Sequence, residues 1–256
     1  MASSYDTIPD FGLLYDSVPL YAARQDIGFY VAEAKATRGN VLEVGCGTGR
    51  ILLPIARGGS TITGIDGSKQ MLERCRANLS AEPAAVQSRV RLAQHDMRDF
   101  SLGAQFALII APFRVVQHLT TIDDQLRFLA AVARHLTPQG RLVFDVFNPR
   151  FDLLVAAGGA EREDTPEQRL ANGRTFRRTY RIVRVRWIDQ VSEAELVYYV
   201  DGKRFVQAFE MRWYLAAELR NLLARAGFRV REIYGDFKRG PLVDACPEIV
   251  VVAELD

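Results

Sequence analysis

Cysteine and histidine are scarce in this chain of 256 residues, which has three of each. The cysteines, Cys46, Cys75 and Cys246, are widely spaced and form no Cys-x-x-Cys pair. Neither a disulfide framework nor a zinc site is therefore indicated. The histidines are equally scattered along the sequence, so we expect no metal centre.

Long apolar runs are absent as well. No run reaches the roughly 18 apolar residues that a membrane-spanning helix needs. The polar start of the chain, Met1 to Asp10, lacks the basic and apolar regions of a signal peptide. We therefore expect a soluble, cytoplasmic protein without a membrane partner.

Lysine is rare, and the net charge is close to zero. Basic residues number 33 against 31 acidic ones, which gives a net charge of +2, and only four of the basic residues are Lys. A dedicated nucleic-acid binder normally has a large basic excess, so we expect no nucleic-acid partner. The preference for Arg fits a GC-rich genome; the alternative is that some Arg bind an anionic partner.

Hydrophobic residues are plentiful, at 48% of the chain, which suffices for one large domain or two small ones. From residue 41 to residue 148, short apolar runs alternate with helical patterns, as is typical of βαβ units on a parallel sheet. The expected strands are Val41–Val44, Thr61–Asp66, Val90–Gln94, Phe106–Ala111 and Arg141–Phe147. The expected helices are Ile51–Arg57, Ser68–Leu79, with Ser68 as its cap, and Ile122–His135.

After Pro149 the pattern changes to longer β-rich segments. Three neighbouring antiparallel strands are expected at Arg174–Asp189, Val191–Val200 and Arg204–Trp213, with a tight turn at Asp201-Gly202. Residues 156–173 contain two adjacent glycines and many charges, and we expect a mobile loop there. The chain is expected to end with a helix at Ala216–Ala226 and strands at Arg229–Tyr234 and Ile249–Glu254.

These elements predict an α/β fold. We expect a Rossmann-like, doubly wound, seven-stranded and mostly parallel sheet, with a small antiparallel β-meander inserted after the fifth strand. The expected parts are an N-terminal helical cap segment (1–40), a core (41–150), an inserted antiparallel β lid (151–214), and a C-terminal helix with the last two strands of the core (215–256).

A glycine-rich loop follows the first expected strand. In Glu43-Val44-Gly45-Cys46-Gly47-Thr48-Gly49, three glycines in five residues let the backbone approach a ligand closely. A dinucleotide fingerprint would need its third glycine at position 50, which is Arg, and no Walker A lysine follows. The spacing, with an acidic residue two positions before the first glycine, resembles motif I of the class I S-adenosylmethionine-dependent methyltransferases.

The resemblance extends to later positions and implies S-adenosylmethionine as cofactor, with S-adenosylhomocysteine as product. It implies that Asp66 accepts hydrogen bonds from the ribose hydroxyls and that Asp96 accepts one from the adenine amino group, beside Met97. It also implies that Glu43 orients the methionine part and that Ala111 faces it. The full expected set of cofactor-binding residues is Tyr15, Glu43, Gly45, Cys46, Gly47, Gly49, Asp66, Gly67, Asp96, Met97 and Ala111.

Catalytic residues are harder to predict, because methyl transfer mostly requires positioning of the nucleophile and removal of a proton. His118, after the fourth strand, is the candidate general base, since His titrates near neutrality and the corresponding region holds a His in several sugar N-methyltransferases that this core resembles. Its alternative role is a helix cap. Tyr21, with Tyr15, lies in an N-terminal segment similar to one that covers the cofactor in many small-molecule methyltransferases; ordinary packing is the alternative.

Three residues are candidates for binding the substrate. Arg114 follows the fourth strand, and Arg212 shares one face of the last meander strand with Tyr214. An Arg flanked by aromatics could hold a substrate carboxylate, as in glycine- and sarcosine-type methyltransferases with comparable insertions. The alternative is that the insertion's arginines only protect a sheet edge.

The sequence therefore predicts an S-adenosylmethionine-dependent methyltransferase acting on an N or O nucleophile of a small molecule that carries a carboxylate or an amine. A nucleic-acid or protein methyltransferase is one alternative. A non-catalytic S-adenosylmethionine-binding module is another. The inserted sheet could also serve as the contact surface of a homodimer.

Overall fold

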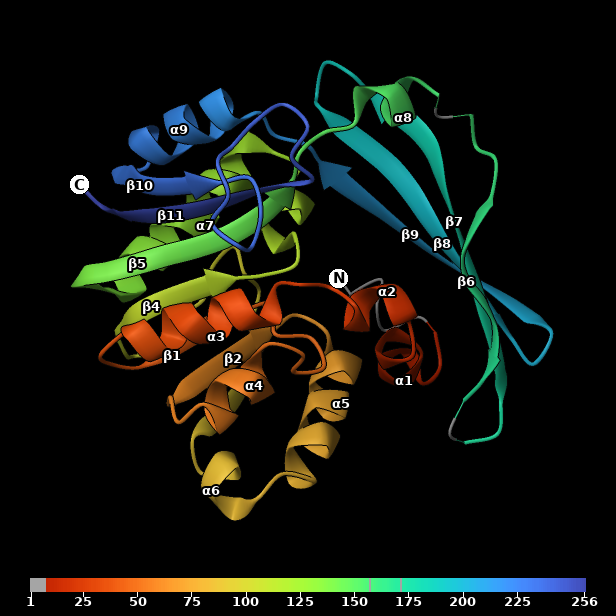
Figure 1. Cartoon of the computed structure of the whole chain (residues 1–256), viewed down its shortest axis with the longest axis horizontal. Coiled ribbons are helices and arrows are strands. Elements are labelled where there is room, and N and C mark those ends of the chain that lie inside the picture. Colours follow the sequence, from red (N-terminus) through yellow and green to blue (C-terminus); the bar gives the residue numbers. More distant parts are fainter. Residues whose placement is uncertain (1–7, 157, 171) are drawn as a thin grey trace.

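The computed structural model describes residues 8–156, 158–170 and 172–256, so the first seven residues of the expected N-terminal segment lie outside the described part. Its central feature is sheet A, whose seven strands lie in the order β10-β11-β5-β4-β1-β2-β3 (Figure 1). The strands are β1 (Val41–Val44), β2 (Ile62–Asp66), β3 (Val90–Gln94), β4 (Phe106–Ala111), β5 (Leu136–Phe147), β10 (Phe228–Tyr234) and β11 (Glu248–Leu255).

Sheet A is mostly parallel. The pairs among β1, β2, β3, β4 and β5 are parallel, whereas β11 is antiparallel to both β5 and β10. The strand order reverses between β1 and β4, which is where doubly wound sheets bind ligands at the carboxyl ends of their strands. The predicted Rossmann-like fold is confirmed.

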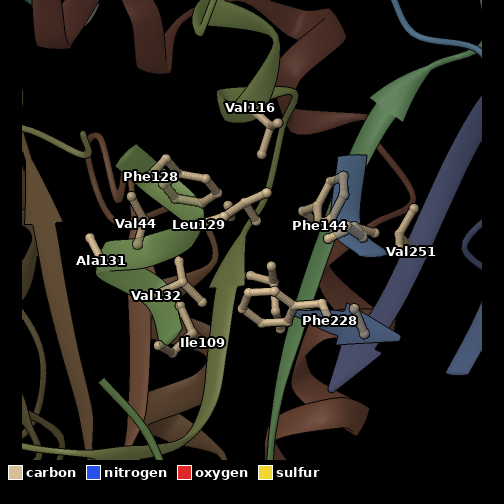
Figure 2. Packing of buried hydrophobic residues seen from close by; sticks show 14 of the residues in the cluster. Val44, Ile109, Val116, Phe128, Leu129, Ala131, Val132, Phe144, Phe228 and Val251 are labelled. Atoms are coloured by element: carbon tan, nitrogen blue, oxygen red, sulfur yellow. The ribbon is translucent and has the colours of Figure 1, made fainter. Parts of the chain in front are cut away.

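Helices cover both faces of sheet A. They are α3 (Ile27–Ala36), α4 (Leu52–Arg57), α5 (Lys69–Ser80), α6 (Ala84–Gln87), α7 (Ile122–His135) and α9 (Ala216–Arg225). Helix α7 places Phe128, Leu129 and Val132 on one face at helical spacing, where they pack against residues such as Ile109 and Phe144 of sheet A (Figure 2). Helices α3 and α4 pack on the opposite face in a second core cluster. The predicted cap of α5 is confirmed, because Ser68 accepts a hydrogen bond from the Met71 amide at 3.2 Å.

The insertion after β5 is a separate antiparallel sheet, sheet B, in the order β6-β7-β8-β9 (Figure 1). Its strands are β6 (Arg162–Arg169), β7 (Thr175–Arg186), β8 (Val191–Val200) and β9 (Lys203–Arg212), and helix α8 (Phe151–Val155) precedes them. Asp201 and Gly202 have φ values of 49° and 75°, as a type I′ hairpin turn requires.

Strand β6 corrects the expectation of a loop over residues 156–173. Its sequence is polar and contains Pro166, both of which disfavour an interior strand. The strand forms because it lies at the edge of sheet B, where only one side pairs, and two register shifts against β7 accommodate its irregular sequence.

The N-terminal segment fills the space between the two sheets. Helices α1 (Phe11–Asp16) and α2 (Pro19–Ala22) lie beside β6 and α5 (Figure 1). Phe11 and Leu14 of α1 pack with Phe176 and Tyr198 of sheet B and with Met71 of α5 in a third apolar cluster. No helix in the described part of the chain is long and apolar enough to cross a membrane.

Candidate functional site

A cavity of about 1160 Å³ lies at the carboxyl ends of β1, β2 and β4. The glycine-rich loop forms its floor, the N-terminal segment and the loop after β4 form its walls, and the inward face of sheet B covers it. Sites for one drug-sized ligand span roughly 300–1,000 Å³, so this cavity has room for two molecules together. We call the part next to the glycine loop the cofactor half and the part under sheet B the acceptor half.

The glycine-rich loop exposes its backbone to the cofactor half. Gly45 and Gly47 have φ values of 71° and 54°, a conformation that favours glycine. A Cβ atom on Gly45 would lie 2.5 Å from a methyl of Val115, so a larger residue cannot fit there without displacing the loop after β4. The Gly47 amide donates to Asp66 Oδ2 at 2.8 Å, which fixes the loop against the end of β2.

Asp66 lines the cavity at the end of β2. Its two carboxylate oxygens accept from the amides of Gly47 and Ser68, both at 2.8 Å. A carboxylate at the cavity wall is an acceptor of the kind that ribose hydroxyls require. The geometry fits the role that the sequence predicts.

Glu43 is the clearest sign of a missing partner in the cofactor half. Its side chain is 2% exposed and lines the cavity, and its Oε2 has no hydrogen-bond partner in the described structure. Burial raises the pKa of the Glu43 carboxyl well above its ordinary value. A buried carboxylate oxygen without a donor fits a ligand that brings a cationic N–H group, as the methionine part of S-adenosylmethionine does.

Asp96, Met97 and Gly67 also line the cavity. Asp96 is held by Arg98, whose Nε donates to Asp96 Oδ1 at 2.9 Å and whose amide donates to the same oxygen at 2.9 Å. The hydrogen bonds from Arg98 lower the pKa of Asp96, so this side chain is an ionised acceptor at neutral pH.

Three aromatic rings meet where the two halves join, and we call them the aromatic triplet. Tyr15, Tyr21 and Phe113 line the cavity, with ring centroids 4.6 Å apart for the tyrosines and 5.0 Å apart for Tyr21 and Phe113. Phe113 and Arg114 have positive φ values of 59° and 67°, which few residues with a side chain adopt. The Phe113 amide donates to Asp145 Oδ1 at 2.8 Å and holds this strained turn.

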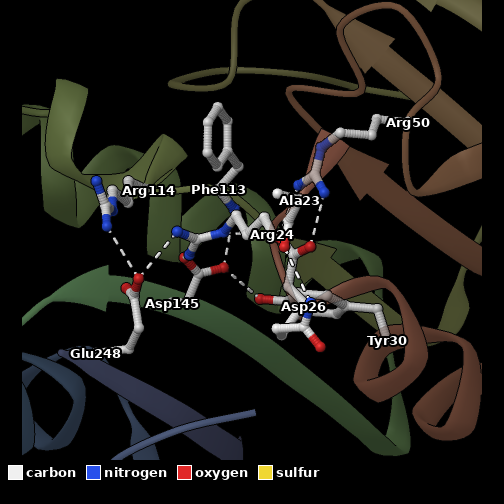
Figure 3. A network of polar contacts seen from close by, with 10 residues as sticks. Ala23, Arg24, Asp26, Tyr30, Arg50, Phe113, Arg114, Asp145 and Glu248 are labelled. Carbon is white, nitrogen blue, oxygen red and sulfur yellow. Dashed lines mark hydrogen bonds and ion pairs between the residues drawn. The ribbon is translucent and has the colours of Figure 1, made fainter. Parts of the chain in front are cut away.

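A buried polar network behind the triplet joins the N-terminal segment to sheet A (Figure 3). Arg24 forms ion pairs with Asp26, Asp145 and Glu248 at 2.7 to 2.9 Å. Arg50, next to the glycine loop, donates through two nitrogens to Asp26, each at 2.6 Å. The network therefore connects β5, β11, the glycine loop and the N-terminal segment.

Two further members of this network are contributed by α3 and by the loop after β4. Tyr30 donates to Asp145 at 2.6 Å, and Arg114 pairs with Glu248 at 2.9 Å (Figure 3). Burial raises the pKa of Asp145, although Arg24 opposes the shift. Arg114 also lines the cavity, as its predicted role in substrate binding requires.

His118 lies at the end of a short 3₁₀ helix, Val115–His118, and borders the acceptor half. Burial lowers the pKa of His118 below its ordinary value, although a hydrogen bond with the backbone of Glu210 in β9 opposes the shift. Its ring centroid is 6.2 Å from that of Phe209 in the same strand. The imidazole is therefore neutral at pH 7, which is the form that accepts a proton.

The chain resembles known methyltransferases in sequence and in fold. Residues 41–140 match a family model described as a methyltransferase domain. The chain therefore contains a methyltransferase domain. Its glycine loop, Glu43 and Asp66 all lie within the matched residues.

Relatives and solved structures extend the likeness beyond the matched domain. A dTDP-3-amino-3,4,6-trideoxy-alpha-D-glucopyranose N,N-dimethyltransferase from Streptomyces venezuelae is 33% identical over 126 residues, which is 49% of this chain and 50% of that protein. A cypemycin N-terminal methyltransferase from Streptomyces sp. is 24% identical over 84% of this chain and 82% of that protein. The CcbJ methyltransferase from Streptomyces caelestis has a similar fold, with a TM-score of 0.79 at 22% identity, covering 99% of this chain and 98% of CcbJ.

Four predicted site residues of the methyltransferase do not line the cavity: Gly49, Ala111, Arg212 and Tyr214. A Cβ on Gly49 would lie 2.9 Å from Cys75 Sγ, so this glycine permits close packing of α5. Arg212 pairs with Glu218 at 2.6 Å and donates to the Asp189 carbonyl at 2.6 Å.

The register of sheet B explains why Arg212 and Tyr214 lie outside. In β9, Gln207, Phe209 and Met211 face the cavity, so the alternation turns Arg212 away from it. Tyr214 lies in the apolar core and donates to the Leu119 carbonyl at 3.2 Å. Their predicted contact with the substrate does not fit this placement.

The sequence interpretation missed several residues of the methyltransferase site. Phe113 had a local signal, because it follows the fourth strand directly, at the edge where ligands bind. The network around Arg24 had no such local signal in the sequence, because Asp145 lies inside a strand and Glu248 lies 224 residues from Arg24.

Proposed function

We propose that this methyltransferase transfers the methyl group of S-adenosylmethionine to an amine nitrogen of a small molecule. The observation that carries the proposal is the two-part cavity, in which a glycine loop with one buried, unpartnered carboxylate oxygen of Glu43 adjoins an aromatic acceptor half covered by sheet B. The relatives named above support nitrogen as the target, because one is named for an amino sugar and the other for an N-terminus.

The residues of the cofactor half suit each part of the cofactor. Glu43 would accept from the amino group of the methionine part, Asp66 from the ribose hydroxyls and Asp96 from the adenine amino group. When bound, the cofactor supplies a methyl group on a positively charged sulfur, which is already activated for transfer. The aromatic triplet lines the cavity where the cofactor half meets the acceptor half.

The acceptor half favours an amine over an alcohol. Its carboxylates Asp164 and Glu195 are engaged by Arg178 at 2.9 Å and by Arg181 at 2.6 Å, so His118 is the group suited to remove a proton. A neutral imidazole can take the proton that an alkylamine loses near neutral pH, whereas an unactivated alcohol requires a much stronger base. His118 would therefore act as the general base, with Arg114 and Tyr21 binding the acceptor.

A screen of methyl acceptors tests this proposal. The purified protein is incubated with S-adenosylmethionine and with amino sugars, amino acids, short peptides, phenols and transfer RNA, and S-adenosylhomocysteine formation is measured. We expect turnover with one class of amines and a mass increase of one or two methyl groups. Turnover with transfer RNA or phenols alone would contradict the proposal.

The homodimer expected through the inserted sheet stays a prediction. Arg186 of β7 pairs with Glu193 and Glu210 at 2.7 and 2.6 Å, and these three side chains do not line the cavity. A face whose charges already pair within one chain gains little from a second copy. Sedimentation velocity at micromolar concentration measures the oligomeric state directly.

A further inference from the structure

A buried ion pair lies on the inward face of sheet B. Arg178 of β7 is 1% exposed, and its Nε and Nη2 donate to the two carboxylate oxygens of Asp164 in β6, each at 2.9 Å. Both side chains line the cavity. Removing a guanidinium and a carboxylate from water is costly, and a pair of apolar residues would fill the same space without that cost. The ion pair therefore suggests a role beyond stability.

The remaining terminal nitrogen of Arg178 points to such a role. Its Nη1 donates to the Tyr21 hydroxyl oxygen at 2.7 Å, and the guanidinium lies 4.8 Å from the centre of the Tyr21 ring. Because the Tyr21 oxygen accepts this bond, its own hydrogen is directed away from Arg178. Burial raises the pKa of Tyr21, although Arg178 opposes the shift, so the hydroxyl keeps its proton at neutral pH.

The contacts around Tyr21 direct the hydrogen of its hydroxyl toward the cavity. Tyr15 and Phe113 pack against the ring of Tyr21. Arg178, which belongs to sheet B, donates a hydrogen bond to the Tyr21 hydroxyl oxygen. Two more exposed contacts, from Gln168 to the Ser17 carbonyl at 2.7 Å and from Arg174 to Asp10 at 3.0 Å, also connect sheet B to the N-terminal segment. Of these three polar contacts, only the one at Arg178 joins residues that line the cavity.

We propose that Arg178, held by Asp164, is a positioning residue that fixes the Tyr21 hydroxyl as a hydrogen-bond donor to an oxygen of the bound molecules. Sheet B thereby sets the geometry of the reacting groups as well as covering them. The inference rests on the proposed function for its catalytic consequence. The oxygen belongs either to the carboxylate of the cofactor or to the methyl acceptor, and the kinetic experiment distinguishes the two.

The first experiment requires no acceptor. The protein is labelled with tyrosine carrying ¹³C at Cζ, and the Tyr21 resonance is assigned by its loss in Tyr21→Phe. We expect Arg178→Met to shift this resonance, because the hydroxyl loses its strongest donor. Arg177→Met is the matched control. Arg177 directly precedes Arg178 in β7, and its guanidinium lies 3.7 Å from the centre of the Tyr199 ring, away from the cavity.

A double variant controls for misfolding of the single variant Arg178→Met. Arg178→Met leaves Asp164 as a buried charge without its partner, whereas Arg178→Met combined with Asp164→Leu removes both charges. The double variant is expected to shift the Tyr21 resonance in the same direction. An unchanged Tyr21 resonance in both variants, or an equal shift in Arg177→Met, would overturn the proposal whatever the outcome of the acceptor screen.

The second experiment uses an acceptor found in the screen. Displacing a reacting group by about 1 Å can cost about 100-fold in rate, so we expect kcat to fall by about that factor in both Arg178→Met and Tyr21→Phe. Combining the two variants should cause no further loss, because both remove the same oriented hydroxyl. Losses that multiply would contradict the proposal.

The bound molecule that accepts the Tyr21 hydrogen bond is identified by a binding measurement. Weaker S-adenosylmethionine binding by Tyr21→Phe, measured by calorimetry, would identify the cofactor as the partner. Unchanged binding with a higher KM for the acceptor would identify the acceptor.

Discussion

The two halves of the cavity are built in different ways. The cofactor half consists of residues that follow the strands of a parallel sheet, and its bonds are short in sequence, such as the one between Gly47 and Asp66, 19 residues apart. The acceptor half is assembled from distant segments, and its central bond joins Tyr21 to Arg178, 157 residues apart. A binding site for a common cofactor can thus be local and backbone-based, whereas a site for a particular acceptor depends on side chains that only the fold brings together.

The sharpest test of the cofactor half is Gly45→Ala. The added Cβ would collide with Val115, and the alanine backbone would have to keep an unfavourable positive φ. We therefore expect S-adenosylmethionine binding to weaken by more than about 100-fold. Calorimetry measures the loss. Gly59→Ala is the control, because Gly59 also has a positive φ, but a Cβ added there would meet no atom within 4 Å, and Gly59 does not line the cavity.

His118→Ala tests the chemistry of the acceptor half. General-base catalysis contributes about 100-fold or more, so we expect kcat to fall by that order while cofactor binding stays unchanged. Burial lowers the pKa of His118, so activity of the wild type should rise with pH through a value below 6.5 and then level off. The rising limb should disappear in His118→Ala. Full activity of the variant would refute the general-base assignment.

Glu43→Gln tests the contribution of Glu43 to cofactor binding. A hydrogen bond to a charged group contributes about 1.5–3 kcal/mol, so we expect cofactor affinity to fall by about 10- to 100-fold. The wild type should bind the cofactor more tightly as pH rises, because the carboxyl must lose its proton to attract a cation. Glu43→Gln should remove this pH dependence, which calorimetry at several pH values would show.

The same carboxyl has the opposite effect on the cofactor-free protein. The pKa of Glu43 is raised by folding, so the folded state binds more protons than the unfolded state above pH 4.5. Stability without cofactor should therefore fall as pH rises through the folded-state pKa, and Glu43→Gln should raise the Tm at pH 7. A lower Tm for the variant would contradict this account of Glu43.

The smallest expected effect on activity is that of Arg212→Met. The side chain lies outside the cavity, so we expect KM and kcat within about twofold of the wild type. Because Arg212 pairs with the partly buried Glu218, the free energy of unfolding should fall by about 2 kcal/mol. Chemical denaturation measures the stability loss, and a large rise in KM would restore the substrate-binding role that the sequence suggested.

The sequence by itself determined the strands of sheet A, the helices α4, α5, α7 and α9 that cover it, the glycine loop and the class of cofactor. These features depend on short-range patterns, because apolar runs, helix caps such as Ser68 and glycine spacing act over a few residues. Residues such as Glu43 and Asp66 could be predicted from their place relative to the loop. Their sites follow from the topology, since the carboxyl ends of neighbouring parallel strands meet at one edge.

Only the tertiary structure decided which side chains face the acceptor. Alternation along β9 left two faces open, and packing of sheet B over the cavity chose the one with Met211 instead of the one with Arg212. A register shift between Ile182 and Arg184 likewise interrupts the alternation in β7. The contacts of Arg178 with Tyr21 and of Arg24 with Asp145 could not be predicted, because a polar contact between residues more than 100 positions apart leaves no periodic or local pattern in the sequence.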